Sequence, residues 1–123
     1  MYRNNAESFL VERLEIKIMS NNWNIPGWLE VKVRDRDKNC VYCHVKLTER
    51  LHKRGAPSDK ATFEHIDNDG PPSKVNIALC CAACNSSKGA KKLLDWFNSS
   101  YCRKKNICKE TTSDIIQNYI ETI

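Results

Sequence analysis

Two Cys-x-x-Cys pairs constrain the fold of this chain more than any other feature of its sequence. The first pair is Cys40 and Cys43, and the second is Cys81 and Cys84. A Cys-x-x-Cys turn directs two thiolates toward one ion, so two such turns supply the four ligands of a closed, tetrahedral zinc site. The sequence therefore predicts two zinc knuckles, far apart along the chain, that meet at one structural Zn²⁺.

Three further cysteines and a histidine stand outside this site. Cys80 would leave a gap of three residues before Cys84, and it ends an apolar stretch, so we expect a buried core thiol. Cys102 and Cys108 have no pair spacing. His44 follows the first knuckle and is an alternative ligand, but four thiols already complete a tetrahedral site, which favours a surface position for His44.

The composition bounds the class of protein. The chain has 123 residues, a length that predicts one domain. Of these residues 28% are charged, and the net charge of +5 is compatible with a polyanionic partner but does not require one. Residues 1–8 do not show the pattern of a secretory signal, so none is expected here, and no apolar run approaches the roughly 20 residues that span a membrane. Seven cysteines in a chain of this kind favour metal binding in the cytoplasm, where disulfides are rare.

Hydrophobic patterning predicts an α+β domain with flanking helices. Strands are expected at 61–66 and 75–79, joined by the Pro- and Gly-rich loop 67–72 into an antiparallel hairpin. An amphipathic helix is expected to follow the capping hydroxyls of Ser86 and Ser87, with one apolar face formed by Ala90, Leu93, Leu94, Phe97 and Tyr101. Residues 6–20 favour a helix over a strand, 46–60 a loop, and Ser113 is expected to cap a last helix.

Three polar residues around the hairpin suit phosphodiester hydrolysis. His65 has the imidazole that a general base near neutral pH requires, and Glu64 and Asn85 offer oxygen ligands of the type Mg²⁺ prefers. Neighbouring residues of a strand point to opposite faces, so a shared site requires a backbone bend or a position at the strand end. Taken singly, each residue is also an ordinary strand or cap residue; their order along the chain carries the interpretation.

That order resembles the HNH endonuclease family. The matching motifs are Glu64-His65-Ile66, Asn76, Cys81-x-x-Cys84-Asn85 and Lys88-Gly89. The resemblance implies a ββα-metal fold in which His65 is the general base and Glu64 and Asn85 hold a single divalent cation, Mg²⁺ or another. It also implies that Asn76 belongs to the catalytic motif and fastens the hairpin loop. Glu64 stands where Asp is commoner, and Asn85 where His is common, which leaves the preferred ion open.

The resemblance covers about residues 31–97 and the flanks are not diagnostic, so the division of the chain also draws on the patterning of the flanking segments. The resemblance favours a helix within 28–36. Three segments are expected: an N-terminal helical extension at 1–27, the ββα-metal zinc domain at 28–101, and a C-terminal basic segment and helix at 102–123. The resemblance implies DNA, expected to be double-stranded, as the substrate, and it leaves open an RNA-directed nuclease and a homodimer. Basic residues expected to grip its phosphates are Lys88, Lys91, Lys92, Arg103, Lys104 and Lys105. The alternative is a non-catalytic, zinc-bound module that binds nucleic acid.

Overall fold

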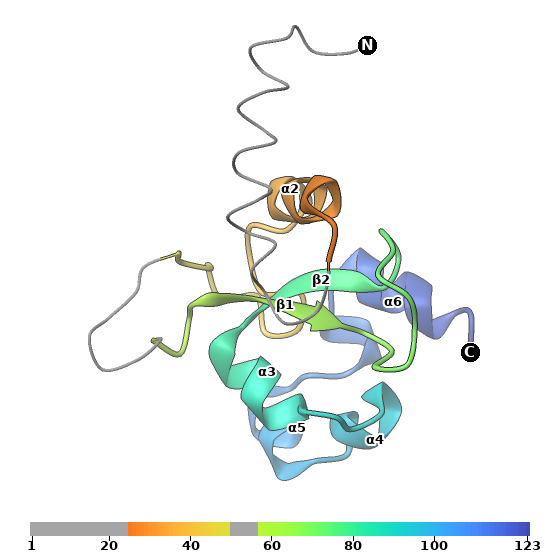
Figure 1. The fold of residues 1–123 in the computed structure, drawn as a ribbon. Coiled ribbons are helices and arrows are strands. Elements are labelled where there is room, and N and C mark those ends of the chain that lie inside the picture. The colour runs from red at the N-terminus through yellow and green to blue at the C-terminus, as the bar shows by residue number, and fades with distance from the viewer. Residues whose placement is uncertain (1–24, 50–56) are drawn as a thin grey trace, which may run out of the picture.

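The computed structural model describes residues 25–49 and 57–123. The predicted α+β class is confirmed, since a two-stranded antiparallel sheet is combined with short helices (Figure 1). The helix expected within residues 6–20 and the middle of the 46–60 loop lie outside the described residues. The elements in chain order are α2 (Gly27–Arg36), β1 (Ala61–His65), β2 (Ile77–Cys81), α3 (Ala82–Lys88), α4 (Leu93–Phe97), α5 (Ser100–Lys105), the 3-10 helix η1 (Lys109–Thr111) and α6 (Asp114–Ile120).

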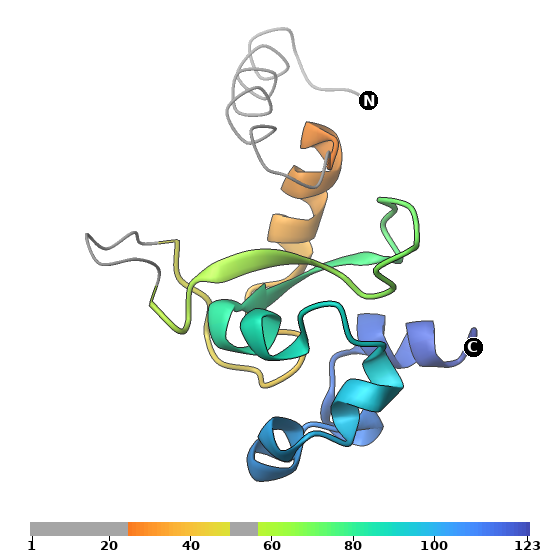
Figure 2. The ribbon, with the colours of Figure 1, turned by 60° about the horizontal axis from the view of Figure 1, so that its bottom comes forward.

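The hairpin of β1 and β2 separates two layers of helix. Figure 2 shows α2 on one side of the hairpin and α3 on the other. Side chains alternate between the two faces of a strand, so Phe63 and Leu79 pack with Leu29 and Val33 of α2. On the opposite face, Cys80 joins a second core, made with the knuckles and the C-terminal helices. The sheet is therefore covered on both faces, which explains why all five residues of β2 are buried.

α2 is attached to the sheet through the residue that ends it. The Asp37 carboxylate accepts a hydrogen bond from the backbone N–H of Leu79 at 3.1 Å, and Arg36 pairs with Asp37 at 2.7 Å. Arg36 also donates to the carbonyl of Ile77 at 2.8 Å. The helix expected within 28–36 is thus present, and its last turn positions it against β2.

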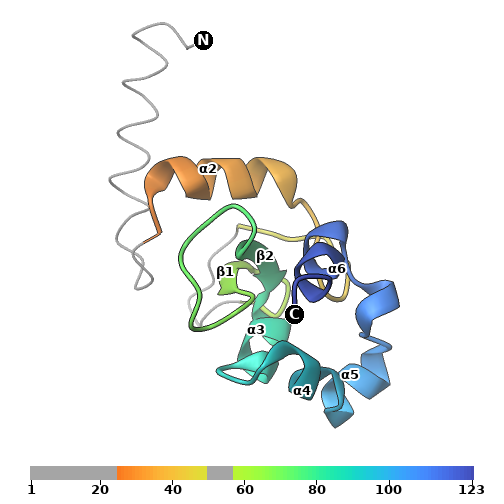
Figure 3. The ribbon, with the colours of Figure 1, turned by 90° about the vertical axis from the view of Figure 1, so that its right-hand side faces the viewer.

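The second core unites the knuckles with the end of the chain. Tyr42 and Trp96 meet edge to face with their ring centroids 4.8 Å apart. The 102–123 segment contributes Cys102, Ile107 and Ile116 to the same buried cluster. Figure 3 shows α3, α4, α5 and α6 arranged around the hairpin. Ser113 holds the N-cap position of α6, as predicted, but its side chain makes no capping hydrogen bond. The C-terminal segment completes the core of the knuckle region.

The hairpin itself is confirmed, with one shift. β2 spans Ile77–Cys81, two residues later than the predicted strand at 75–79. Val75 is 69% exposed and lies in a turn, because the backbone N–H groups of Asn76 and Ile77 both donate to the carbonyl of Ser73. The strand begins only after this turn.

The long helix predicted after Ser86 and Ser87 is wrong. Three short helices occupy this stretch, and α3 begins earlier, at Ala82, with the sulfur of Cys81 accepting the first-turn N–H of Cys84. Gly89 ends α3 at φ 51° and ψ −131°, a positive-φ conformation that glycine adopts readily, and Lys92 is extended before α4. The predicted apolar face is only partly buried as a result: Leu93 is 3% exposed, whereas Leu94 is 47% exposed.

Candidate functional site

The four knuckle cysteines form one cluster. The sulfur atoms of Cys40, Cys43, Cys81 and Cys84 all lie within 4.8 Å of one another, with Cys43 and Cys81 3.7 Å apart. In a tetrahedral site with zinc–sulfur bonds of about 2.3 Å, the sulfurs lie about 3.8 Å apart. These cysteines therefore have the number and spacing that could hold a metal ion, as their paired spacing in the sequence predicts.

Each knuckle points backbone and side-chain donors at its sulfurs. The N–H groups of Tyr42 and Cys43 lie 3.4 Å from the sulfur of Cys40, and the hydroxyl of Tyr101 lies 3.3 Å from that of Cys84. Because metals bind the thiolate, such donors favour the ligand form of the sulfur.

The remaining candidates for this cluster lie elsewhere, as predicted. Cys80 is fully buried in the core, where burial raises its pKa well above the ordinary value. His44 adopts a left-handed backbone conformation at φ 68°, is exposed, and its ring bonds to the carbonyl of Thr111. It closes the first knuckle against η1 rather than joining the sulfurs.

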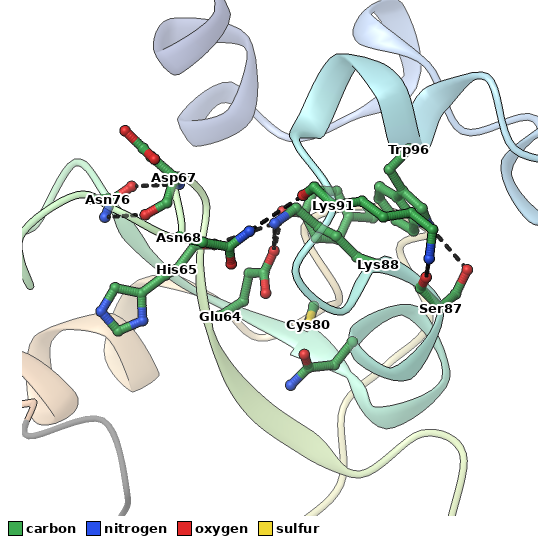
Figure 4. A network of polar contacts seen from close by, with 12 residues as sticks. Glu64, His65, Asp67, Asn68, Asn76, Cys80, Ser87, Lys88, Lys91 and Trp96 are labelled. Atoms are coloured by element: carbon green, nitrogen blue, oxygen red, sulfur yellow. Dashed lines mark hydrogen bonds and ion pairs between the residues drawn. The ribbon is translucent and has the colours of Figure 1, made fainter.

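Glu64 is buried in a polar network between β1 and α3. Its Oε2 atom lies 2.8 Å from the ammonium nitrogen of Lys88 and accepts the hydroxyl of Tyr42 at 2.9 Å. Burial raises the pKa of Glu64, and the ammonium of Lys88 partly offsets that rise. Burial also raises the pKa of Tyr42 well above its ordinary range, so its hydroxyl remains a donor. Figure 4 shows Glu64 and Lys88 facing each other.

His65 lies on the other side of the strand. The pairs Glu64–Ala78 and His65–Ile77 continue the regular register, so the backbone does not bend between Glu64 and His65. In Figure 4 the imidazole of His65 points away from the side chain of Glu64. His65 is, however, the last residue of β1, which is the strand-end position anticipated from the loop that follows. Burial and, to a lesser degree, the charge of Lys88 lower the pKa of His65, which favours the neutral imidazole.

Asn85 is on the same face of the sheet as Glu64. Its side-chain amide donates to the hydroxyl of Thr62 at 3.0 Å and approaches the carbonyl of Phe63 at 3.5 Å. Thr62 precedes Glu64 by two residues, so both face α3. Among the predicted trio, Glu64 and Asn85 thus share the interface between β1 and α3, whereas the side chain of His65 is directed to the opposite face of β1.

Asn76 fastens the hairpin loop. Its side-chain amide donates to the carbonyls of Asp67 and Pro71, both at 3.1 Å, and its Oδ1 atom accepts the N–H of Asp67 at 2.8 Å. Gly70 passes so close that a β-carbon there would lie 2.8 Å from Asn76 Nδ2. The loop between the strands is therefore built around one buried carboxamide.

Replacing Asn76 with Ala should destabilise the protein by about 1 to 3 kcal/mol, because the backbone groups of the loop lose their partners in a buried position. Urea unfolding of the full chain measures this effect. Asn68→Ala is the matched control, since Asn68 is exposed in the same loop and donates only a 3.3 Å bond to Lys91. Equal stabilities of the two variants would contradict the fastening role.

The predicted phosphate-gripping residues fall into two groups. Five are exposed, on and around α4 and α5: Lys91, Lys92, Arg103, Lys104 and Lys105. Lys88 is different, because it is fully buried. Helical spacing alone would place Lys88 on one polar face with Lys91 and Lys92, but in this structure Lys88 is paired with Glu64 across the interface of α3 and β1.

Among known proteins, the chain is similar to one that is named for the HNH endonuclease family. The chain is 33% identical over 82 residues to a protein of Bacillus subtilis (strain 168) named "SPbeta prophage-derived putative HNH endonuclease YoqL". The match covers 64% of this chain and 34% of that protein, so the chain spans about a third of its relative. No protein-family model matches the chain, and no solved structure matches it. Within the described ranges, no helix has the length and apolar character needed to cross a bilayer.

Proposed function

We propose that this chain is a metal-dependent HNH-type endonuclease that hydrolyses phosphodiester bonds of DNA. The observation that carries the proposal is the packing of α3 against β1, in which the side chains of Asn85 and Glu64 share one interface and Asn85 directly follows the cysteine cluster. The similarity to a protein named for HNH endonucleases supports the same reading. The nuclease unit is residues 28–101, preceded by an extension at 1–27, and the 102–123 segment completes its core.

The four knuckle cysteines hold a structural Zn²⁺ in this proposal. The four sulfurs lie within 4.8 Å of one another. Four cysteine ligands around one ion are typical of zinc sites without a catalytic role, because no coordination position remains for water. The ion would fix the knuckle of Cys40 and Cys43 beside the start of α3. It thereby sets the position of Asn85, which directly follows the last zinc ligand.

Glu64 and Asn85 are the proposed ligands of the catalytic divalent cation. Their oxygen atoms suit Mg²⁺ or Mn²⁺, which when bound would neutralise charge on the phosphate. The carboxylate and the amide lie on the same face of the sheet, which fits such an ion, although Glu64 is here paired with Lys88. His65 would take a proton from water at the strand end, and the neutral imidazole favoured by its lowered pKa suits that task.

The proposed substrate is double-stranded DNA. One site of this kind cuts one strand, so cleavage of both strands would require two sites, as in a homodimer. The exposed cations of α5 supply a grip on the phosphate backbone that is largely independent of sequence. Cation contacts of this type predict that binding weakens steeply as salt is raised.

Cleavage of a supercoiled plasmid by zinc-loaded protein tests the proposal. With Mg²⁺ or Mn²⁺ we expect nicked or linear products on a gel, and with a chelator none. Sequencing of the cut ends reports specificity and strand count, and a parallel RNA substrate separates DNA from RNA hydrolysis. Protein that binds plasmid normally and leaves it intact with either ion would overturn the enzymatic proposal.

The second candidate is a non-catalytic zinc module that binds nucleic acid. Two observations favour it: Glu64 is already paired with a buried lysine, and the imidazole of His65 faces the other side of β1. In that case the polar network stabilises the fold alone. Binding of one zinc ion per chain with no second, weaker divalent site would support this candidate.

A further inference from the structure

The side chain of Lys88 is enclosed between α3 and β1. None of its surface is exposed, and its ammonium nitrogen lies 2.8 Å from Glu64 Oε2 and 3.3 Å from the carbonyl oxygen of His65. An ammonium group removed from water is costly unless a charge and hydrogen-bond acceptors surround it. The carboxylate proposed to bind a divalent ion therefore has a cation of the protein beside it.

The local fold fixes this arrangement. Asn85 and Lys88 are three residues apart on α3 and so share one face of the helix. Asn85 reaches Thr62 and Lys88 reaches Glu64, two residues further along β1. Gly89 turns the chain away directly after Lys88, in a positive-φ conformation that most side chains disfavour. Lys88 is thus held at the strand position where the cation ligand lies.

Glu64 Oε2 also accepts a hydrogen bond from a residue of the first knuckle. Tyr42, which lies between Cys40 and Cys43, donates its hydroxyl to Glu64 Oε2 at 2.9 Å. Tyr42 packs edge to face on Trp96, whose indole N–H donates to the hydroxyl of Ser87 at 2.9 Å. Glu64 therefore meets a neutral donor and a cation, and the network connects the cysteine cluster, β1 and the end of α3.

We propose that Lys88 is the internal counter-ion of Glu64, and that a divalent cation binds Glu64 only by displacing the ammonium group of Lys88. This inference rests on the proposed role of Glu64 as a ligand. A divalent ion and an ammonium group at one carboxylate oxygen would repel each other strongly in a buried site. The four-carbon side chain of Lys88 allows its ammonium to move outward, and the predicted phosphate contact of Lys88 then belongs to the metal-loaded state.

Lys88→Met in the full, zinc-loaded chain tests the competition directly. It removes the competing cation and keeps an unbranched side chain of similar length. We expect the affinity for Mn²⁺, measured by electron paramagnetic resonance, to rise about tenfold or more, since two buried positive charges no longer compete. Lys91→Met is the matched control: Lys91 is exposed, loses the same charge, and should leave the affinity unchanged.

The melting temperature is a second measurement of this competition, and it does not depend on nuclease activity. Metal-free Lys88→Met leaves Glu64 buried without its cation, so its melting temperature should fall, and Mn²⁺ should restore much of the loss. The double variant Glu64→Gln/Lys88→Met carries neither charge and should show no response to Mn²⁺. A Lys88→Met protein that folds and binds Mn²⁺ no more tightly than the wild type would overturn the proposal.

If Lys88→Met does not fold, the displacement of Lys88 by a divalent cation can be tested in the wild-type chain. Amine acetylation followed by mass spectrometry should find Lys88 protected without Mn²⁺ and reactive with it, against Lys91 as an internal reference. Protection unchanged at Mn²⁺ concentrations that support cleavage would overturn the proposal. A rise in Mn²⁺ affinity without cleavage by any form would instead overturn the proposed nuclease function and leave the counter-ion role in place.

Discussion

Cys84→Ala is expected to abolish cooperative thermal unfolding of this chain. The four sulfurs join a turn after α2, the end of β2 and the first turn of α3, and three of them are fully or almost fully buried. Structural zinc contributes on the order of 10 to 16 kcal/mol in small peptides, which is comparable to the whole stability of an ordinary domain, about 5 to 15 kcal/mol. Loss of one ligand should therefore unfold the region built on the cluster.

Circular dichroism during heating, together with the zinc content of the purified protein, measures this effect. Cys108→Ala is the matched control, because Cys108 is half-buried and lies outside the cluster. The control should retain its zinc and its transition. A chelator added to the wild type should reproduce the behaviour of Cys84→Ala. Similar melting curves for the two variants would show that the cluster does not carry the stability assigned to it.

Most of the features that were predicted correctly from the sequence are encoded over short distances. A Cys-x-x-Cys turn places its two thiolates by local geometry alone, and the hairpin follows from two apolar runs separated by Pro and Gly. The burial of Cys80 followed from its position beside an apolar strand. The meeting of the two knuckles was predictable too, because a tetrahedral ion needs four ligands and each turn supplies two.

The break in the predicted long helix had a signal in the sequence. Apolar residues recur at helical spacing from Ala90 to Tyr101, and that periodicity outweighed Gly89 in the prediction. Short helices joined by turns can present residues of the same spacing to one core, so periodicity does not establish continuity. A glycine directly after a polar helical turn is a common C-terminal signal, and here it ends α3.

The burial of Lys88 had no local signal. On a helical wheel it lies with Lys91 and Lys92 on the polar face, and its partner Glu64 is on a different element. Only the packing of α3 on β1 brings the two charges together. The divergence of Glu64 and His65, by contrast, was foreseeable, since neighbouring strand residues point to opposite faces unless the backbone bends.

His65→Ala is expected to lower plasmid cleavage by about 10² to 10⁴-fold, the usual contribution of a general base. His65 ends β1 beside the loop fastened by Asn76, and it is 9% exposed. Because the imidazole and the Glu64 carboxylate lie on opposite sides of β1, a phosphate contacted by both must sit across the strand end. The base role therefore requires that position to be open to DNA.

His44→Ala is the control for this prediction, since His44 is an exposed histidine of the first knuckle whose ring bonds to the carbonyl of Thr111. It should cleave at close to the wild-type rate, and both variants should keep their zinc and their melting transition. Added imidazole should restore part of the activity of His65→Ala, because a small base can enter the space left by the side chain, whereas a purely structural histidine would show no such rescue. Wild-type cleavage by a folded His65→Ala protein would exclude His65 as the base and would direct the search to the other side of β1, where Glu64, Lys88 and Tyr42 meet.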